Sequence, residues 1–206
     1  QRTERDFHDL EVSGAIKVYV KQDSAYSVKI VTDANLQEYV ETRSSGGKLV
    51  IKPKSGYNLR PSSSIKVYVS GPQFDHFNVS GASHIYGEGR LNLAGELSLD
   101  LNGASSVEMD IRSPKVEVEV SGASTARLTG ETKDLRVKGN GASHAKCFGL
   151  MSEKAEVDVS GASGAEVFAS VELKADASGA SHIRYKGNAA VTQKNESGAA
   201  SVKKEE

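Results

Sequence analysis

The fold is decided by residues 116–128, which read VEVEVSGASTARL. Valine alternates with glutamate over residues 116–120, and this pattern is typical of a strand with one buried face. A Ser-Gly-Ala-Ser turn follows, and a second alternating segment begins with Ala126 and Leu128. The stretch therefore predicts a strand, a tight corner and another strand in immediate succession.

The same unit recurs along the chain. Its corner glycines are Gly81, Gly103, Gly122, Gly141, Gly161 and Gly179, with a degenerate last copy at Gly198. Successive glycines lie 18 to 22 residues apart, and apolar residues tend to recur two, four and six positions before each. This period predicts the coils of a β-solenoid. Glycine provides the backbone freedom for a tight bend, and we expect the small alanine after it to point inward.

The coils should stack by parallel pairing at about 4.8 Å per rung. A second corner, at residues 112–114, 130–132 and 148–150, should separate the two short strands of each coil. We expect an all-β fold with a right-handed parallel β-helix, because parallel crossovers are right-handed by default. A left-handed hexapeptide solenoid is the alternative, although no hexad repeats within the coil.

The repeats divide the chain into three parts. Residues 1–75 lack the clean repeat but contain strand-like segments, including IKVYV at residues 16–20 and again at 65–69. We expect this part to form a β-rich subdomain that caps one end of the solenoid, since exposed strand edges need cover. The repeat solenoid spans residues 76–202. Its last coil has Thr192, Lys194 and Glu196 at the inward positions and should end the stack, followed by a tail at residues 203–206.

Composition excludes several classes of function. The chain has 206 residues and a formal net charge of -1, so it lacks the cationic excess of a nucleic-acid-binding protein. No apolar run approaches the roughly 18 residues that a transmembrane helix needs. Cys147 is the only cysteine, which excludes an intrachain disulfide and a thiolate metal cluster. Because the chain begins with Gln1, we expect an export segment to have been removed.

Three histidines, His84, His144 and His182, each follow Gly-Ala-Ser. Rung spacing separates the first two by roughly 14 Å and the last two by roughly 10 Å. Zinc ligands must lie about 2 Å from one centre, so we predict no metal site within one chain and no cofactor. A role for these histidines between chains of a homo-oligomer stays open, beside their interpretation as exposed corner residues.

Catalytic and aromatic patterns are weak. Asp158 and Asp176 should lie on adjacent rungs, about 5 Å apart, a separation that suits the carboxylates of a glycosidase. Nothing in the sequence builds a cleft around them, and we predict that the protein is not an enzyme.

The tyrosines most able to reach the surface occupy different repeat positions and form no stripe, so we expect core or rim packing: Tyr19, Tyr68, Tyr86 and Tyr185.

These motifs resemble the family described as putative auto-transporter adhesin, head GIN domain, which is found mostly in exported proteins of Bacteroidetes. The resemblance depends on VSGAIKVYV at residues 12–20, on residues 35–40 leading into 48–51, on residues 65–69, and on the repeated Ser-Gly-Ala-Ser corners. It covers essentially the whole chain. It implies export to the periplasm or cell surface, often with a lipid anchor, and it supplies no catalytic or binding residues.

The sequence thus favours an exported, non-enzymatic, adhesin-like protein of the cell envelope. Its repetitive face would bind a surface ligand, either a glycan or an envelope protein, through many weak contacts. A self-associating structural scaffold is the first alternative. A polysaccharide-active enzyme that uses Asp158 and Asp176 is the second.

Overall fold

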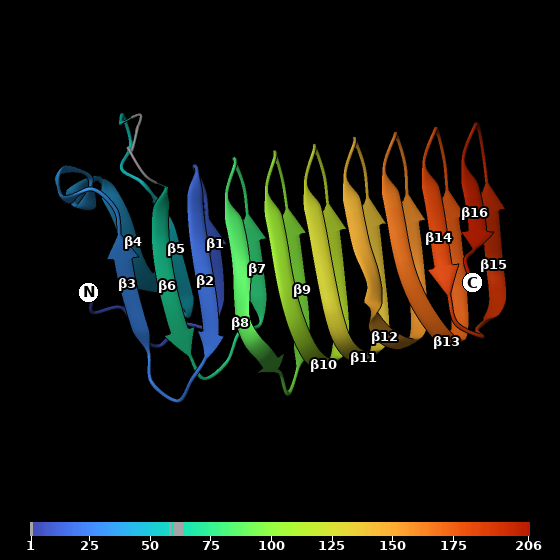
Figure 1. Ribbon diagram of the computed structural model, residues 1–206, viewed down its shortest axis with the longest axis horizontal. Helices are drawn as coiled ribbons and strands as arrows, with labels where there is room; N and C mark the ends of the chain where they lie inside the picture. The colour runs from blue at the N-terminus through green and yellow to red at the C-terminus, as the bar shows by residue number, and fades with distance from the viewer. Residues whose placement is uncertain (1, 58, 60–63) are drawn as a thin grey trace.

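The computed structural model describes residues 2–57, 59 and 64–206 and confirms the predicted all-β solenoid. The solenoid has about 7 turns, and its parallel bridges join residues about 19 positions apart. Figure 1 shows the strands as one row, with β3 to β6 at one end and β15 and β16 at the other. In the described residues, no helix is long and apolar enough to span a bilayer.

Sixteen strands and one short 3-10 helix make up the described part of the chain. The strands are β1 Asp9–Val12, β2 Ile16–Gln22, β3 Ser27–Val31, β4 Val40–Ser45, β5 Lys48–Pro53, β6 Ile65–Gly71, β7 His76–Val79, β8 His84–Asn92, β9 Glu96–Leu101, β10 Ser106–Val120, β11 Thr125–Gly139, β12 His144–Val159, β13 Gly164–Ala177, β14 His182–Lys186, β15 Ala190–Glu196 and β16 Ser201–Lys204. The 3-10 helix η1, Ala34–Tyr39, precedes β4.

The central coils differ from the prediction at their second corner. The prediction that this corner separates two short strands in each coil is wrong for β10 to β13, which each run for 14 to 16 residues through it without a break. Pairing between β10 and β11 continues across it, with Ile111 opposite Gly130 and Ser113 opposite Thr132. The backbone hydrogen bonds between neighbouring rungs continue through the bend. The chain therefore curves at the corner and stays within the sheet.

The first third of the chain stacks out of sequence order. Strands β1 and β2 lie between β5 and β6 on one side and β7 and β8 on the other, and these pairs are parallel. The two IKVYV copies are direct neighbours, with Ile16 opposite Ile65 and Val20 opposite Val69. Strands β3 and β4 pair antiparallel with β6 and β5. Strands β1 to β7 thus join the same sheet as the repeats, and their buried side chains join the same core.

The Gly-Ala-Ser corners form a second ladder along the stack. Each corner glycine has a positive φ, and its carbonyl accepts a hydrogen bond from the alanine amide of the next corner, as from Ala123 to Gly103 at 2.7 Å. The alanines are exposed, so the expectation that they point inward is wrong. The serine after each alanine is buried instead, because its hydroxyl can donate to a backbone carbonyl inside the corner, as Ser143 Oγ does to Val120 O at 3.0 Å.

We predict unequal effects of removing two of these buried hydroxyls. Ser143→Ala should lower the free energy of unfolding by about 1 kcal/mol, because one buried hydrogen bond is lost. Ser83→Ala should change it by less than about 0.5 kcal/mol, because Ser83 Oγ is equally buried but has no hydrogen-bond partner among the described residues. Urea unfolding monitored by circular dichroism measures both values, and equal losses would contradict the role of this hydrogen bond.

A stripe of tyrosines runs along the outside of the first coils. Tyr19 lies between Tyr68 and Tyr86, with ring centroids 5.0 and 5.4 Å away and rings nearly parallel. The expectation that the tyrosines form no stripe is therefore wrong for these three, because the out-of-order stacking of β6, β2 and β8 brings them together. The rings largely cover one another's faces, which fits packing along the rim.

The last coil of the described residues is largely exposed. All seven residues of β15 are exposed, and Lys194 and Glu196 lie opposite the buried Ala175 and Ala177 of β13. A register shift places Val191, not Thr192, opposite Leu173. At the very end, β16 pairs with β14 and includes Lys203 and Lys204. The charged side chains of these strands disfavour edge-to-edge pairing with another chain.

Candidate functional site

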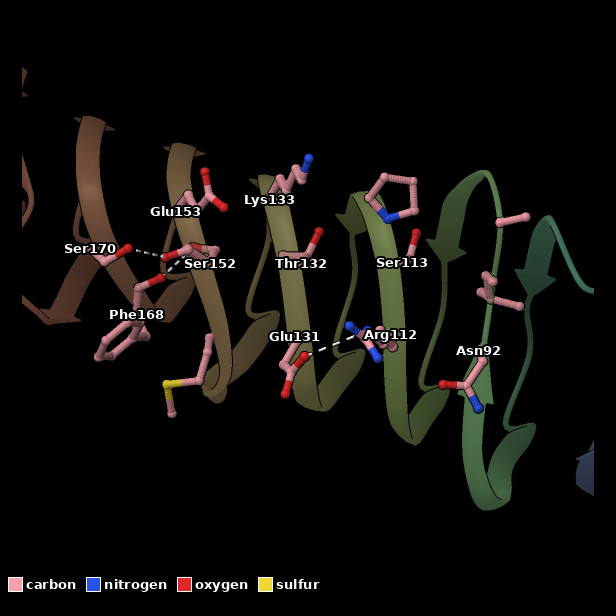
Figure 2. Close-up of a pocket in the computed structure, with 14 residues that line it drawn as sticks. Asn92, Arg112, Ser113, Glu131, Thr132, Lys133, Ser152, Glu153, Phe168 and Ser170 are labelled. Atoms are coloured by element: carbon pink, nitrogen blue, oxygen red, sulfur yellow. Dashed lines mark hydrogen bonds and ion pairs between the residues drawn. The ribbon is translucent and has the colours of Figure 1, made fainter.

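A groove runs along the second corners near the middle of the stack, and we call it the corner groove. It has a volume of about 660 Å³ and crosses five successive rungs, from β8 to β13. Figure 2 shows its side chains along neighbouring strands. It is lined by Asn92, Leu93, Ala94, Arg112, Ser113, Pro114, Glu131, Thr132, Lys133, Met151, Ser152, Glu153, Phe168 and Ser170.

A local irregularity creates the apolar part of this groove. Cys147 of β12 pairs with Val167 of β13, but the next pair is Met151 with Phe168, so β12 has three extra residues there. Met151 lies in the same outward-facing column as Arg112 and Glu131 and is 46% exposed, and the register shift places it opposite Phe168. Sequence reasoning missed the groove. The uneven glycine spacing, 20 residues before Gly161 and 18 after it, is the signal that could have shown where the coils differ.

The serine and threonine hydroxyls that line the groove donate hydrogen bonds to backbone carbonyls of the fold. Ser113 Oγ donates to the carbonyls of Gly95 and Lys115, at 2.8 and 2.7 Å. Thr132 Oγ1 and Ser170 Oγ also donate to backbone carbonyls, at 3.2 Å each. These hydroxyls hold the bent ladder together, and the groove's charged side chains are the groups with capacity left for a ligand.

Charged side chains on neighbouring strands line the same groove. Arg112 Nε lies 3.6 Å from Glu131 Oε2, the ion pair drawn in Figure 2, and Arg90 reaches Glu131 at 4.0 Å. Lys133 and Glu153 add one charge of each sign. Arg112 and Glu131 are well exposed, so this pair contributes little to stability and its groups can exchange partners.

The structure separates His84 from the other two corner histidines. His84 Nδ1 lies 2.6 Å from Ser106 Oγ, and burial followed by the charge of Lys17 lowers the pKa of its imidazole. His144 and His182 approach each other more closely than rung spacing predicts, with ring centroids 6.2 Å apart. Gly164 lies on the rung between them and has no side chain, so the two rings lean into that space.

The His144–His182 pair lines a hollow of about 170 Å³ with Lys146, Glu166 and Arg184. Arg184 already pairs with Glu166, and the two cationic side chains oppose a bound metal ion. The role of the three histidines between chains stays a prediction.

Neither candidate for chemistry lies in the corner groove. Asp158 and Asp176 are neighbours on β12 and β13, as predicted, but Asp176 accepts hydrogen bonds from Gln193, at 2.6 Å, and from Asn195. Cys147 is fully buried, and desolvation raises the pKa of its thiol to about 12. A thiol with such a pKa is protonated at neutral pH and is a poor nucleophile.

A stack of parallel coils with a Gly-Ala-Ser corner ladder and a lateral groove defines a class, the β-solenoid repeat proteins. The chain belongs to the family described as "Putative auto-transporter adhesin, head GIN domain", whose profile matches residues 6–189. The resemblance found in the sequence is thereby confirmed.

Solved structures from Bacteroidetes share the fold. A "putative adhesin" from Bacteroides fragilis NCTC 9343 is 17% identical, with a TM-score of 0.87 and coverage of 97% of this chain and 93% of that one. A "putative adhesin" from Parabacteroides merdae ATCC 43184 is 20% identical, with a TM-score of 0.78 and coverage of 100% and 94%. A "putative lipid binding protein" from Parabacteroides distasonis ATCC 8503 is 21% identical, with a TM-score of 0.72 and coverage of 98% and 93%. No curated protein matches the chain.

Proposed function

We propose that this protein is an exported, non-enzymatic adhesin of the periplasm or cell surface, and that its corner groove holds an extended glycan along the stacking axis. The observation that carries the proposal is the groove itself, which crosses five rungs and offers similar corner positions on each. Membership of the adhesin family supports the class of function.

The chemistry of the corner groove suits a glycan chain. Pro114, Met151 and Phe168 provide apolar surface for the carbon-bearing faces of sugars, while Arg112 and Glu131 can bind hydroxyl or acidic groups. A chain of repeating units can meet successive rungs, so several weak contacts add up to useful affinity. The groove is open along its length, which favours a polymer over a small enclosed substrate.

The proposal is tested by a glycan array, with affinity for the best glycan then measured by calorimetry. Met151→Glu should weaken binding at least tenfold, which corresponds to about 1.4 kcal/mol, because it places a charge on the apolar wall. Val191→Glu is the matched control. It changes another exposed apolar residue, outside the groove, and should leave the affinity within about twofold.

Three outcomes would contradict the proposal. Equal weakening by Met151→Glu and Val191→Glu would place binding elsewhere. Binding to liposomes but to no glycan would instead favour a lipid ligand, which the name of the Parabacteroides distasonis neighbour suggests. Empty arrays together with a discrete oligomer in light scattering would favour the self-associating scaffold.

A further inference from the structure

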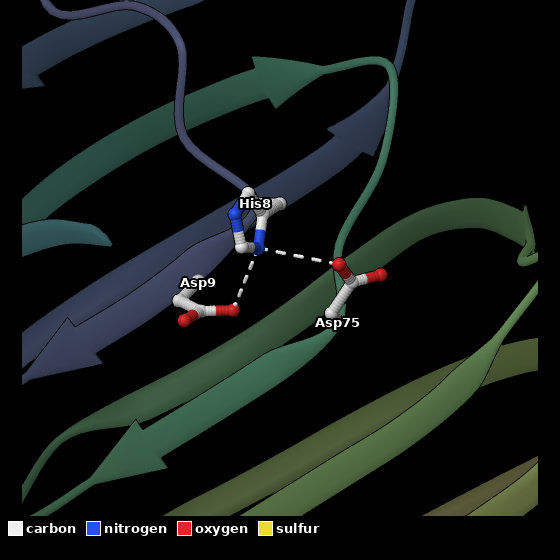
Figure 3. Close-up of side chains that lie close together, drawn as sticks. All are labelled: His8, Asp9 and Asp75. Carbon is white, nitrogen blue, oxygen red and sulfur yellow. Dashed lines mark hydrogen bonds and ion pairs between the residues drawn. The ribbon is translucent and has the colours of Figure 1, made fainter. Parts of the chain in front are cut away.

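A histidine and two aspartates meet at the point where β1 joins β7. His8 Nδ1 lies 3.0 Å from Asp9 Oδ1 and 3.2 Å from Asp75 Oδ2. Figure 3 shows the imidazole between the two carboxylates, which come from neighbouring rungs. One ligand atom from each residue can be chosen so that all three lie within 4.8 Å of one another. The corner groove does not include any of the three.

The backbone holds these three residues in place. The Asp75 amide donates to the His8 carbonyl at 2.8 Å, and the amides of His8 and Asp9 both donate to Gly47 O, at 2.8 and 3.0 Å. The imidazole lies against Gly47, where an added Cβ would come within 2.4 Å of His8 Nε2. The ligand atoms are therefore attached to a rigid ladder, and such preorganisation lowers the cost of binding an ion.

The distances fit the coordination of a metal ion. Ligands at about 2.1 Å from a metal are separated by about 3.0 Å at a right angle and about 3.4 Å at a tetrahedral angle. The two observed distances from His8 Nδ1, 3.0 and 3.2 Å, lie in this range. The two carboxylates, from Asp9 and Asp75, make this a site that attracts a cation. All three side chains are part-exposed, so water can complete the coordination.

We propose that His8 Nδ1, one oxygen of Asp9 and one oxygen of Asp75 bind a single divalent transition-metal ion, with Zn²⁺ as the reference ion. The imidazole nitrogen selects against Mg²⁺ and Ca²⁺, which prefer oxygen ligands, and suits Zn²⁺, Co²⁺ or Ni²⁺. The ion takes the position of the proton between Nδ1 and the carboxylates, and the neutral imidazole then carries its one proton on Nε2. The site joins β1 to the segment before β7 and is independent of glycan binding in the corner groove.

The test is calorimetric titration of the full chain with ZnCl₂, together with absorption spectra of the Co²⁺ complex. We expect one ion per chain and a melting temperature several degrees higher at saturation. Asp75→Asn should weaken Zn²⁺ binding at least tenfold, because it replaces a charged ligand with a neutral amide. His76→Gln is the matched control and should leave affinity within twofold. His76 Nε2 lies 2.8 Å from Asp100 Oδ2 on the adjoining rungs and is outside the proposed ligand set.

Three results would overturn the proposal. The first is no uptake of Zn²⁺ at protein and metal concentrations near 1 mM. The second is uptake that Asp75→Asn leaves unchanged. Amide NMR spectra of the wild-type chain with substoichiometric Co²⁺ test the site without any variant, so the result does not depend on whether a variant folds. Broadening centred on residues 8, 9, 47 and 75 supports the site, and broadening centred on His144 and His182 rejects it.

Discussion

Gly122→Ala should lower the free energy of unfolding by about 3 kcal/mol. Gly122 has a φ of +68°, and an alanine in this left-handed region costs roughly 1–2 kcal/mol. The added Cβ would also lie 2.5 Å from the carbonyl oxygen of Gly103. That oxygen accepts the corner hydrogen bond from Ala123, so the two rungs must move apart and weaken it.

Gly89→Ala separates the cost of backbone strain from the cost of the steric contact between successive corners. Gly89 has a similar φ of +82°, but an added Cβ there meets no atom within 4 Å. We expect a loss of only about 1 kcal/mol, from backbone strain alone. Urea unfolding of both variants provides the comparison. Losses of the same size would show that the close approach of successive corners contributes nothing to stability.

Phe77→Ala should lower the free energy of unfolding by about 3–5 kcal/mol, the range for removing a fully buried phenylalanine. Phe77 is 0% exposed and lies beside Phe74, with ring centroids 5.7 Å apart. Its neighbours on β1 and β9 are held by backbone ladders, so they cannot collapse into the cavity that the truncation leaves.

Val191→Ala is the control for this second variant. Val191 lies opposite the buried Leu173 but is itself 40% exposed. We expect a change within about 0.5 kcal/mol. A small effect of Phe77→Ala in the same thermal and urea experiments would contradict the assignment of the main core to the first coils.

These expectations follow from a core whose buried side chains are larger in the first coils than in the later ones. The fully buried phenylalanines of the described residues, Phe7, Phe74 and Phe77, all lie in the first coils. In the later coils, alanine takes many inward positions, including Ala126, Ala145, Ala165 and Ala175. In a solenoid each coil is stabilised by its own packing and by its neighbours, so the coils near β15 and β16 should open first.

The repeat was enough to predict the architecture because each coil carries its own local signals. Glycine at a positive φ, alternating apolar residues and a constant period are short-range features, and they specify strands, corners and stacking register together. The regular period also places opposite charges on neighbouring rungs, as in the pairs that Arg136 makes with Glu117 and Glu156, at 4.0 and 3.1 Å.

The sequence alone does not predict which coils are neighbours in the stack, nor the features that depend on these neighbours. The sequence predicts that the two IKVYV copies form strands, but only the folded stack places β6 beside β2 and aligns their tyrosines. The corner groove depends on three extra residues in β12 that bulge against β13. His8, Asp9 and Asp75 meet because β1 pairs with β7 across more than sixty residues of chain.

The sequence by itself therefore determined the β-solenoid, its approximate period and its corner glycines, because these result from interactions within one coil and from the repetition of that coil. The tertiary structure alone decided the order of the first coils, the inward serines, the groove and the histidine–aspartate cluster. Those features arise from contacts between segments far apart in the chain, where the small irregularities of individual coils decide which side chains meet.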